Sequence, residues 1–170
     1  MVRVDGLVLD SATDLPVPGA QVAIGVTTAT ANAAGSYAAT VPLGEQPVRI
    51  DGESVGTVRL RDRTYRGDFY VHNTGCVARY GTIVDQRTRR PVVGALVSFG
   101  APGVALTTAT DYTGWFRLTL GCPGTPCVGF NTSFLSIRHP QYRSESFPVG
   151  RGICSVYRED YEITPEQEVQ

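Results

Sequence analysis

The chain has 170 residues, of which 42% are apolar and 18% charged, a composition typical of a globular protein and not of a disordered one. Its formal net charge of -1 gives no global attraction to nucleic acid or to anionic lipid, so we expect neither as a partner. No apolar run reaches the roughly 18 residues that would cross a membrane, so we expect no membrane span.

Strand patterns follow one another from the N-terminus, and no segment has the apolar stripe of a helix. Val2, Val4 and Val8 alternate with polar residues, and two further alternating runs cover residues 20–24 and 37–41. Turn-forming residues separate these runs at 10–19 and 32–35. Short strands at this spacing predict an antiparallel Greek-key β-sandwich.

The second half of the chain repeats the first. Residues 79–99 (RYGTIVDQRTRRPVVGALVSF) match residues 4–24 (VDGLVLDSATDLPVPGAQVAI), and residues 106–120 match 27–41 after a slightly longer loop. The shared positions include Gly6/Gly81, Asp10/Asp85, Thr13/Thr88, Pro16/Pro91, Gly19/Gly94, Ala20/Ala95, Asn32/Asp111, Gly35/Gly114 and Tyr37/Phe116. A repeat of this length is too long for a solenoid, so we expect two tandem immunoglobulin-like or transthyretin-like sandwiches, residues 1–72 and 73–170.

Turn chemistry explains most of the shared residues. Asp10 and Asp85 end the first strand of each repeat, where a carboxylate can accept hydrogen bonds from the following turn. The glycines at the shared positions allow tight turns that a side chain would strain. The repeated polar residues are therefore expected to have structural roles.

The repeated pattern, GxVxDxxTxxPVxGAxV followed by T-x-(D/N)-x-x-G-aromatic, resembles the carboxypeptidase regulatory-like domain. Both halves match it well over their first part and loosely over the rest. The resemblance implies a transthyretin-like seven-stranded β-sandwich. It says little about activity, because such modules are appended to many unrelated surface proteins.

All four cysteines lie in the second half, and no histidine stands at zinc-ligand spacing from them. Disulfides are therefore expected in preference to a zinc site, which implies oxidising surroundings. Of the three possible connectivities, the first choice pairs Cys122 with Cys127 across a short loop and Cys76 with Cys154 between the first and last strands.

The sequence offers no convergent catalytic group. His72 and His139 stand alone, without the HxH segment of the intradiol dioxygenases that share the sandwich, and no GxSxG elbow occurs. Glu159, Asp160 and Glu162 flank the last strand without calcium-loop spacing, which favours a solvated strand edge. We therefore expect no enzyme activity, no cofactor and no metal.

Two surface features are candidate binding sites. Arg59, Arg61 and Arg63 alternate with apolar residues, and such an arginine row is either simply solvated or a site for a polyanion or acidic partner. Trp115, the only tryptophan, is expected to point away from the core. It serves either interdomain packing or, with Tyr80 or Tyr112, as a stacking platform for sugar or protein.

These observations predict a non-catalytic, surface-exposed structural or protein-binding module, such as a scaffold, spacer or adhesion unit. The alternative is a carbohydrate-binding module that uses the aromatic residues around Trp115. The cysteines indicate an extracellular or cell-surface location. Since the N-terminus has no secretory signal pattern, a decoration or tail component of a virion is a further alternative.

Overall fold

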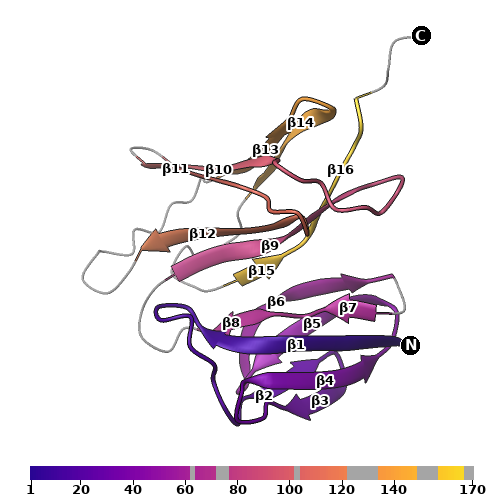
Figure 1. Ribbon diagram of the computed structural model, residues 1–170, viewed down its shortest axis with the longest axis vertical. Helices are drawn as coiled ribbons and strands as arrows, with labels where there is room; N and C mark the ends of the chain where they lie inside the picture. Colours follow the sequence, from indigo (N-terminus) through magenta and orange to yellow (C-terminus); the bar gives the residue numbers. More distant parts are fainter. Residues whose placement is uncertain (62–63, 72–76, 102–103, 122–133, 149–156, 167–170) are drawn as a thin grey trace. The chain divides into compact units, whose positions relative to one another are not determined.

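Figure 1 shows the computed structural model, which describes residues 1–61, 64–71, 77–101, 104–121, 134–148 and 157–166. The described chain is all-β and contains no helix, which confirms the predicted fold class. It divides into two compact units. Unit 1 comes mainly from Met1–Ala78 and Ser155–Glu159, and unit 2 mainly from Arg79–Leu120, Pro126–Cys154 and Asp160–Gln170.

Unit 1 is a sandwich of two sheets. Its strands are β1 (Val2–Asp10), β2 (Gln21–Ile24), β3 (Thr27–Thr30), β4 (Ser36–Val41), β5 (Gly44–Ile50), β6 (Glu53–Leu60), β7 (Thr64–Arg66), β8 (Phe69–Val71) and β15 (Tyr157–Glu159). One sheet has the order β4-β1-β7, with β8 also paired to β1. The other sheet runs β3-β2-β5-β6-β15. Pairing is antiparallel except for β7 and β8 on β1 and β15 on β6.

The core of unit 1 follows directly from the alternation in the sequence. Val2, Val4 and Val8 of β1 are fully buried, while Arg3 between them is exposed. The alternate residues of β4 and β6 are buried in the same way. Burial of such aliphatic side chains stabilises a sandwich by roughly 1.5 to 3 kcal/mol each. The inward faces of both sheets form one apolar cluster.

Unit 2 repeats this arrangement. Its strands are β9 (Val77–Asp85), β10 (Leu96–Ala101), β11 (Val104–Ala109), β12 (Trp115–Gly121), β13 (Phe134–His139), β14 (Tyr142–Pro148) and β16 (Tyr161–Ile163). One sheet has the order β11-β10-β13-β14, and the other places β12 and β16 on either side of β9. A separate core cluster includes Ile83, Phe99, Phe116 and Leu135.

Each strand described in unit 2 has a counterpart in unit 1. The sheet order β3-β2-β5-β6 of unit 1 corresponds to β11-β10-β13-β14 of unit 2, and β4-β1-β8 corresponds to β12-β9-β16. The register also agrees, because Val8 pairs with Phe69 in unit 1 while Ile83 pairs with Tyr161 in unit 2. The sequence repeat is therefore a repeat of complete β-sandwiches.

The shared polar residues have the predicted turn roles. The Asp10 carboxylate accepts hydrogen bonds from the backbone N–H groups of Ala12 and Thr13, each at 2.9 Å. Asp85 does the same for Arg87 and Thr88 at 2.8 and 2.7 Å.

The shared glycines of the second turn pair are equally constrained. Gly35 and Gly114 have φ values of 71° and 76°, in the left-handed region. A side chain at Gly114 would also place its Cβ 2.5 Å from the carbonyl oxygen of Ile83, and at Gly35 2.8 Å from that of Val8. Each copy therefore needs glycine here for the same two reasons.

Candidate functional site

The aromatic residues proposed as a stacking platform have very different exposure. Tyr112, in the turn before β12, is 81% exposed. Trp115 is half-buried, and its ring lies 5.5 Å from that of Tyr80, at an interplanar angle of 49°. Tyr80 is fully buried and therefore presents no ring face to a ligand. Only Tyr112 and part of Trp115 remain as candidate contact surface.

The arginine row is partly described. Arg59 is exposed and donates to Glu45 at 3.2 Å across the β5–β6 hairpin, while its neighbours Val58 and Leu60 are buried. Arg61 is also exposed. Arg63 lies outside the described residues. An exposed pair such as Arg59–Glu45 contributes little to stability, so Arg59 can exchange Glu45 for another anion at small cost.

The disulfides and the absence of a metal site and of a membrane span are further predictions from the sequence. The four cysteines, Cys76, Cys122, Cys127 and Cys154, all fall outside the described residues, so their pairing stays a prediction. In the part of the chain that the structure describes, no three His, Cys, Asp or Glu side chains gather where they could hold a metal ion. None of the described residues forms a helix with the length and apolarity needed to cross a membrane.

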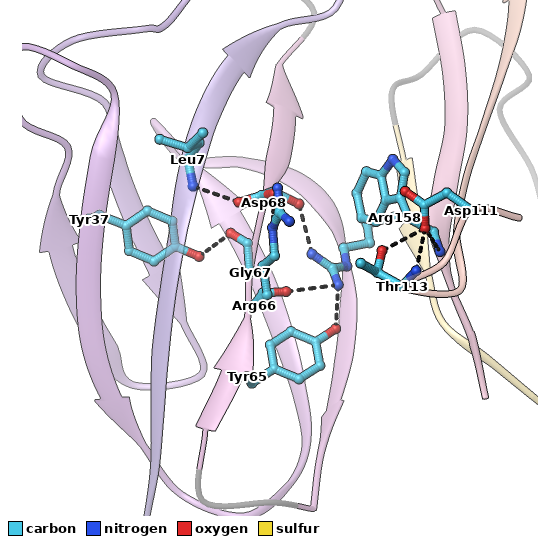
Figure 2. A network of polar contacts seen from close by, with 10 residues as sticks. Leu7, Tyr37, Tyr65, Arg66, Gly67, Asp68, Asp111, Thr113 and Arg158 are labelled. Atoms are coloured by element: carbon cyan, nitrogen blue, oxygen red, sulfur yellow. Dashed lines mark hydrogen bonds and ion pairs between the residues drawn. The ribbon is translucent and has the colours of Figure 1, made fainter. Parts of the chain in front are cut away.

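A buried polar network in unit 1 was not predicted (Figure 2). Arg158 of β15 is fully buried, with its guanidinium among residues of the β7–β8 segment. It donates to the carbonyl oxygen of Asp68 at 2.8 Å, to the hydroxyl of Tyr65 at 2.7 Å and to the carbonyl oxygen of Arg66 at 3.2 Å. These bonds compensate part of the cost of removing the guanidinium from water.

Aromatic rings complete the surroundings of Arg158. Its guanidinium carbon lies 5.0 Å from the ring centroid of Tyr65 and 5.4 Å from that of Phe69. A weakly hydrated, planar guanidinium suits such ring faces better than an ammonium group does. The site is therefore specific for arginine in both its hydrogen bonds and its stacking.

Gly56 of β6 allows β15 to lie close to β6. β15 pairs in parallel with β6 through Arg158 opposite Gly56 and Glu159 opposite Thr57. Gly56 has a φ of 154°, and a Cβ built there would lie 2.4 Å from the carbonyl oxygen of Arg158. In unit 2 the same hairpin position holds Phe147, which pairs with Leu135 as Gly56 pairs with Val48. Gly56 is thus required by the approach of β15 and not by the hairpin.

In each repeat an aspartate forms a hydrogen bond to the backbone of the first strand. Asp68 follows β7, and Asp160 follows β15. Asp68 accepts a hydrogen bond from the backbone N–H of Leu7 at 3.0 Å (Figure 2). Asp160 accepts one from the backbone N–H of Thr82 at 2.9 Å and a second from the Thr82 hydroxyl at 2.9 Å. Leu7 and Thr82 hold equivalent positions in the two repeats. The expectation that Asp160 lies on a solvated strand edge is therefore wrong, because its carboxylate holds the backbone of β9.

A signal for this network was present in the sequence. Residues 65–69 read YRGDF and residues 157–161 read YREDY, so both contain the pattern Tyr-Arg-x-Asp-aromatic. The alternation of apolar residues that identified the strands does not reveal this second repeat. In unit 1, Tyr37 stacks with Phe69 at a centroid distance of 6.2 Å, and in unit 2 Phe116 packs with Tyr161 at 6.0 Å. Both units thus keep an aromatic pair at this position, but the tyrosine of the pair is Tyr37 of β4 in unit 1 and Tyr161 of β16 in unit 2.

The carboxylate of Asp85 has a perturbed pKa. Burial acts to raise it, but hydrogen bonds from the Thr88 N–H, the Tyr142 hydroxyl and the Arg87 N–H outweigh burial and lower the pKa below its ordinary value. The Tyr142 hydroxyl donates to Asp85 at 2.9 Å. Burial, and then this bond, raise the pKa of Tyr142. The Asp85–Tyr142 pair therefore has a structural role, because its hydrogen bonds link the turn after β9 to β14.

The structure defines an all-β protein with two repeated sandwiches, and comparison with known proteins adds no family to this description. No family model matches it, and no curated protein sequence does. Solved structures with similarity include the Bacillus anthracis TIE protein (13% identity, 96% of this chain, 34% of that chain, TM-score 0.37) and the Streptococcal ancillary pilin (13% identity, 98% and 63%, TM-score 0.36). The shaft pilin SpaA from Lactobacillus rhamnosus GG is 11% identical, with 99% and 98% covered and a TM-score of 0.40. The chain thus spans about a third of the first of these proteins and under two thirds of the second.

Proposed function

We propose that the chain is a non-catalytic structural or protein-binding module exposed outside a cell. One observation carries the proposal: the aspartates that both repeats retain accept hydrogen bonds from backbone N–H groups of their own unit. Asp10 and Asp85 hold turns, and Asp68 and Asp160 hold the first strand of each unit. A fold whose retained carboxylates are fully used in this way is suited to rigidity, because catalytic groups must remain available to a substrate.

The family resemblance agrees with this proposal. Strand order and turn glycines are what a pair of carboxypeptidase regulatory-like domains would need, and we propose that relationship for both repeats. Modules of this kind take their partners from the protein to which they are attached. An extracellular or cell-surface location follows from the proposed disulfides. The virion location stays a prediction.

Mapping the contacts of the chain in its native assembly tests the proposal. Cross-linking mass spectrometry on the source cells or particles should find cross-links from this chain to a protein neighbour. Turnover of a small molecule by the purified chain, abolished by substitution of a single carboxylate or histidine, would overturn it.

A carbohydrate-binding function is the second candidate, favoured by the exposed ring of Tyr112. Sugar rings stack on exposed aromatic faces, and a half-buried Trp115 stands in the same turn region. A glycan array with the unmodified chain and with Tyr112→Ala and Trp115→Ala variants distinguishes the two functions. Glycan binding that both substitutions abolish would support this candidate over the first.

A further inference from the structure

We propose that one end of unit 2, formed by the turns at residues 86–93 and 111–114, binds an acidic segment of a protein partner. The inference rests on the proposed protein-binding function and gives that function a location and a partner chemistry. It comes from comparing the two repeats, which build the same backbone at this end but place different side chains on it.

The backbone of the two ends is the same. In unit 2 the N–H of Ile83 donates to the carbonyl oxygen of Gly114 at 2.8 Å, and in unit 1 that of Val8 donates to Gly35 at 2.8 Å. Isolated bridges join Val84 to Pro91 and Leu9 to Pro16. Even the left-handed residue of the first turn is matched, with φ of 62° at Arg89 and 59° at Asp14. The scaffold therefore does not require the side chains that differ.

The side chains at this end differ between the units: unit 1 has alanine, aspartate, leucine and proline where unit 2 has three arginines, a valine and a tyrosine. The equivalent pairs at this end are Ala12/Arg87, Asp14/Arg89, Leu15/Arg90, Pro18/Val93 and Ala33/Tyr112. Three guanidinium groups and a tyrosine ring are thereby gained. The carboxylate of Asp14 is lost, and that of Asp111 stands where unit 1 has Asn32; the Asp111 carboxylate accepts hydrogen bonds from Thr113 and Trp115 within its own turn. We call the exposed residues Arg87, Arg90, Val93 and Tyr112 the basic-aromatic end.

These side chains are available to a partner. Arg89 is engaged by Glu162 at 2.6 Å. Within the described residues, Arg87 and Arg90 have no ion pair, and both are exposed. Val93 and Tyr112 are 53% and 81% exposed. The adjacent turns are in contact, because the Cβ of Pro91 lies 3.2 Å from where a Cβ on Gly114 would be.

This combination selects an acidic polypeptide. Tyrosine and arginine are enriched among the residues that carry protein–protein binding energy. Arg87 and Arg90 can each take a carboxylate in two parallel hydrogen bonds, while Tyr112 and Val93 supply exposed apolar area at the same end of the unit. A partner segment with glutamate or aspartate beside an aliphatic side chain matches both requirements.

The test is an NMR titration of the full chain, labelled with ¹⁵N, with the acetylated and amidated peptide EELEELG. The control peptide is QQLQQLG, which has the same shape and no charge. The key variants transplant the residues of unit 1: R87A/R90L and Y112A. Since the same turn already carries those residues in unit 1, the variants should fold. R138A/R143A removes two exposed arginines from β13 and β14 and controls for net charge.

We expect EELEELG to shift amide signals of residues 86–94 and 111–115, and we expect binding to weaken by about fivefold to tenfold in R87A/R90L. Y112A should weaken it by a similar factor, while R138A/R143A should bind as the unmodified chain does. No binding, or equal loss in R138A/R143A, would overturn the inference. So would equal binding of QQLQQLG, tighter binding of a heparin oligosaccharide, or signals that move with protein concentration instead of with peptide. Native cross-links from elsewhere on the chain would then leave the proposed function standing and remove only this site.

Discussion

The carboxylate of Asp160 accepts a hydrogen bond from the backbone N–H of Thr82 at 2.9 Å, and this bond has a counterpart between Asp68 and Leu7 in the other unit. An N–H of a first strand that its neighbouring strand leaves unpaired is thus satisfied by a side chain in both repeats. Both bonds are partly buried, and backbone groups removed from water are nearly always paired, so the aspartate at this position stabilises each unit.

Substituting these aspartates should destabilise each unit separately. We expect Asp160→Ala to cost unit 2 about 1 to 3 kcal/mol, because the Thr82 N–H loses its acceptor. Asp68→Ala should have the same effect on unit 1. Hydrogen exchange of peptides from β9 and β1 measures each effect in its own unit, with Glu53→Gln on the surface as control. Equal acceleration in both units by either substitution would contradict separate roles.

Arg158→Met should loosen the edge of unit 1. The substitution keeps the apolar stem but leaves the carbonyl oxygens of Arg66 and Asp68 short of a donor, at a cost of about 1 to 3 kcal/mol. Faster hydrogen exchange in β6 and β7 is the expected result. Arg143→Met, on the exposed face of β14, is the matched control and should change exchange little. Unchanged exchange in β6 would show that Arg158 does not hold this edge.

Gly56→Ala should separate the hairpin from β15. The new Cβ would meet the carbonyl oxygen of Arg158, so β15 must move away or β6 must distort. We expect limited proteolysis to cut near residues 155–160 several times faster than in the unmodified chain. Glu53→Ala, at an exposed position of the same strand β6, should not increase cleavage there. A crystal structure of Gly56→Ala with β15 in place would contradict the close approach.

Asp85 should make the stability of unit 2 depend on acid pH. Its pKa is lower in the folded state than the ordinary value of about 3.9 in the unfolded chain, so its contribution is complete above about pH 4 and is lost as pH falls through the folded pKa. Asp85→Asn should therefore cost about 1 to 3 kcal/mol at pH 7, and the difference should shrink toward pH 2.

Trp115 makes the acid measurement possible. It is the only tryptophan and belongs to unit 2, so urea unfolding followed by its fluorescence reports on that unit. Asp10→Asn, the same substitution in unit 1, should leave the tryptophan signal unchanged. A constant difference between Asp85→Asn and the unmodified chain from pH 7 to pH 2 would argue against the lowered pKa.

The cysteines should form two disulfides, Cys122 with Cys127 and Cys76 with Cys154. Each is expected to stabilise the chain by about 2 to 4 kcal/mol. Peptide mapping under non-reducing conditions identifies the pairs, and thiol titration of the unfolded, unreduced chain should find none free. Four free thiols would remove the argument for an oxidising location.

The sequence predicted the sandwich class and the turns because those depend on local patterns. Alternation of valines and the Asp and Gly positions of the turns determine strands and connections within short windows. The domain boundary near residue 72 stays a prediction, because that link lies outside the described residues.

The burial of Arg158 was not predicted, and Asp160 was wrongly placed on a solvated edge, because the partners of both residues are distant in sequence. A charged run such as Tyr157-Arg158-Glu159-Asp160 is typical of a solvated edge when it is considered alone. Only the pairing with β6 and β9 buries Arg158 and engages Asp160. Aligning the run with Tyr65-Arg66-Gly67-Asp68 would have indicated two matched anchors. The burial of one arginine and not the other depends on Gly56, a contact that no local pattern encodes.

The pairing of β15 with β6 also sets an order of events during synthesis. Arg158 is separated from its acceptor Asp68 by 90 residues, so the ribosome must translate most of the chain before unit 1 can bury this arginine. Until then the outer edge of β6 presents unpaired backbone groups, the kind of edge that recruits other strands. Loop closure over such a distance is slow compared with local pairing. The nascent chain is therefore most exposed to misassociation in the interval between the emergence of β6 and that of β15.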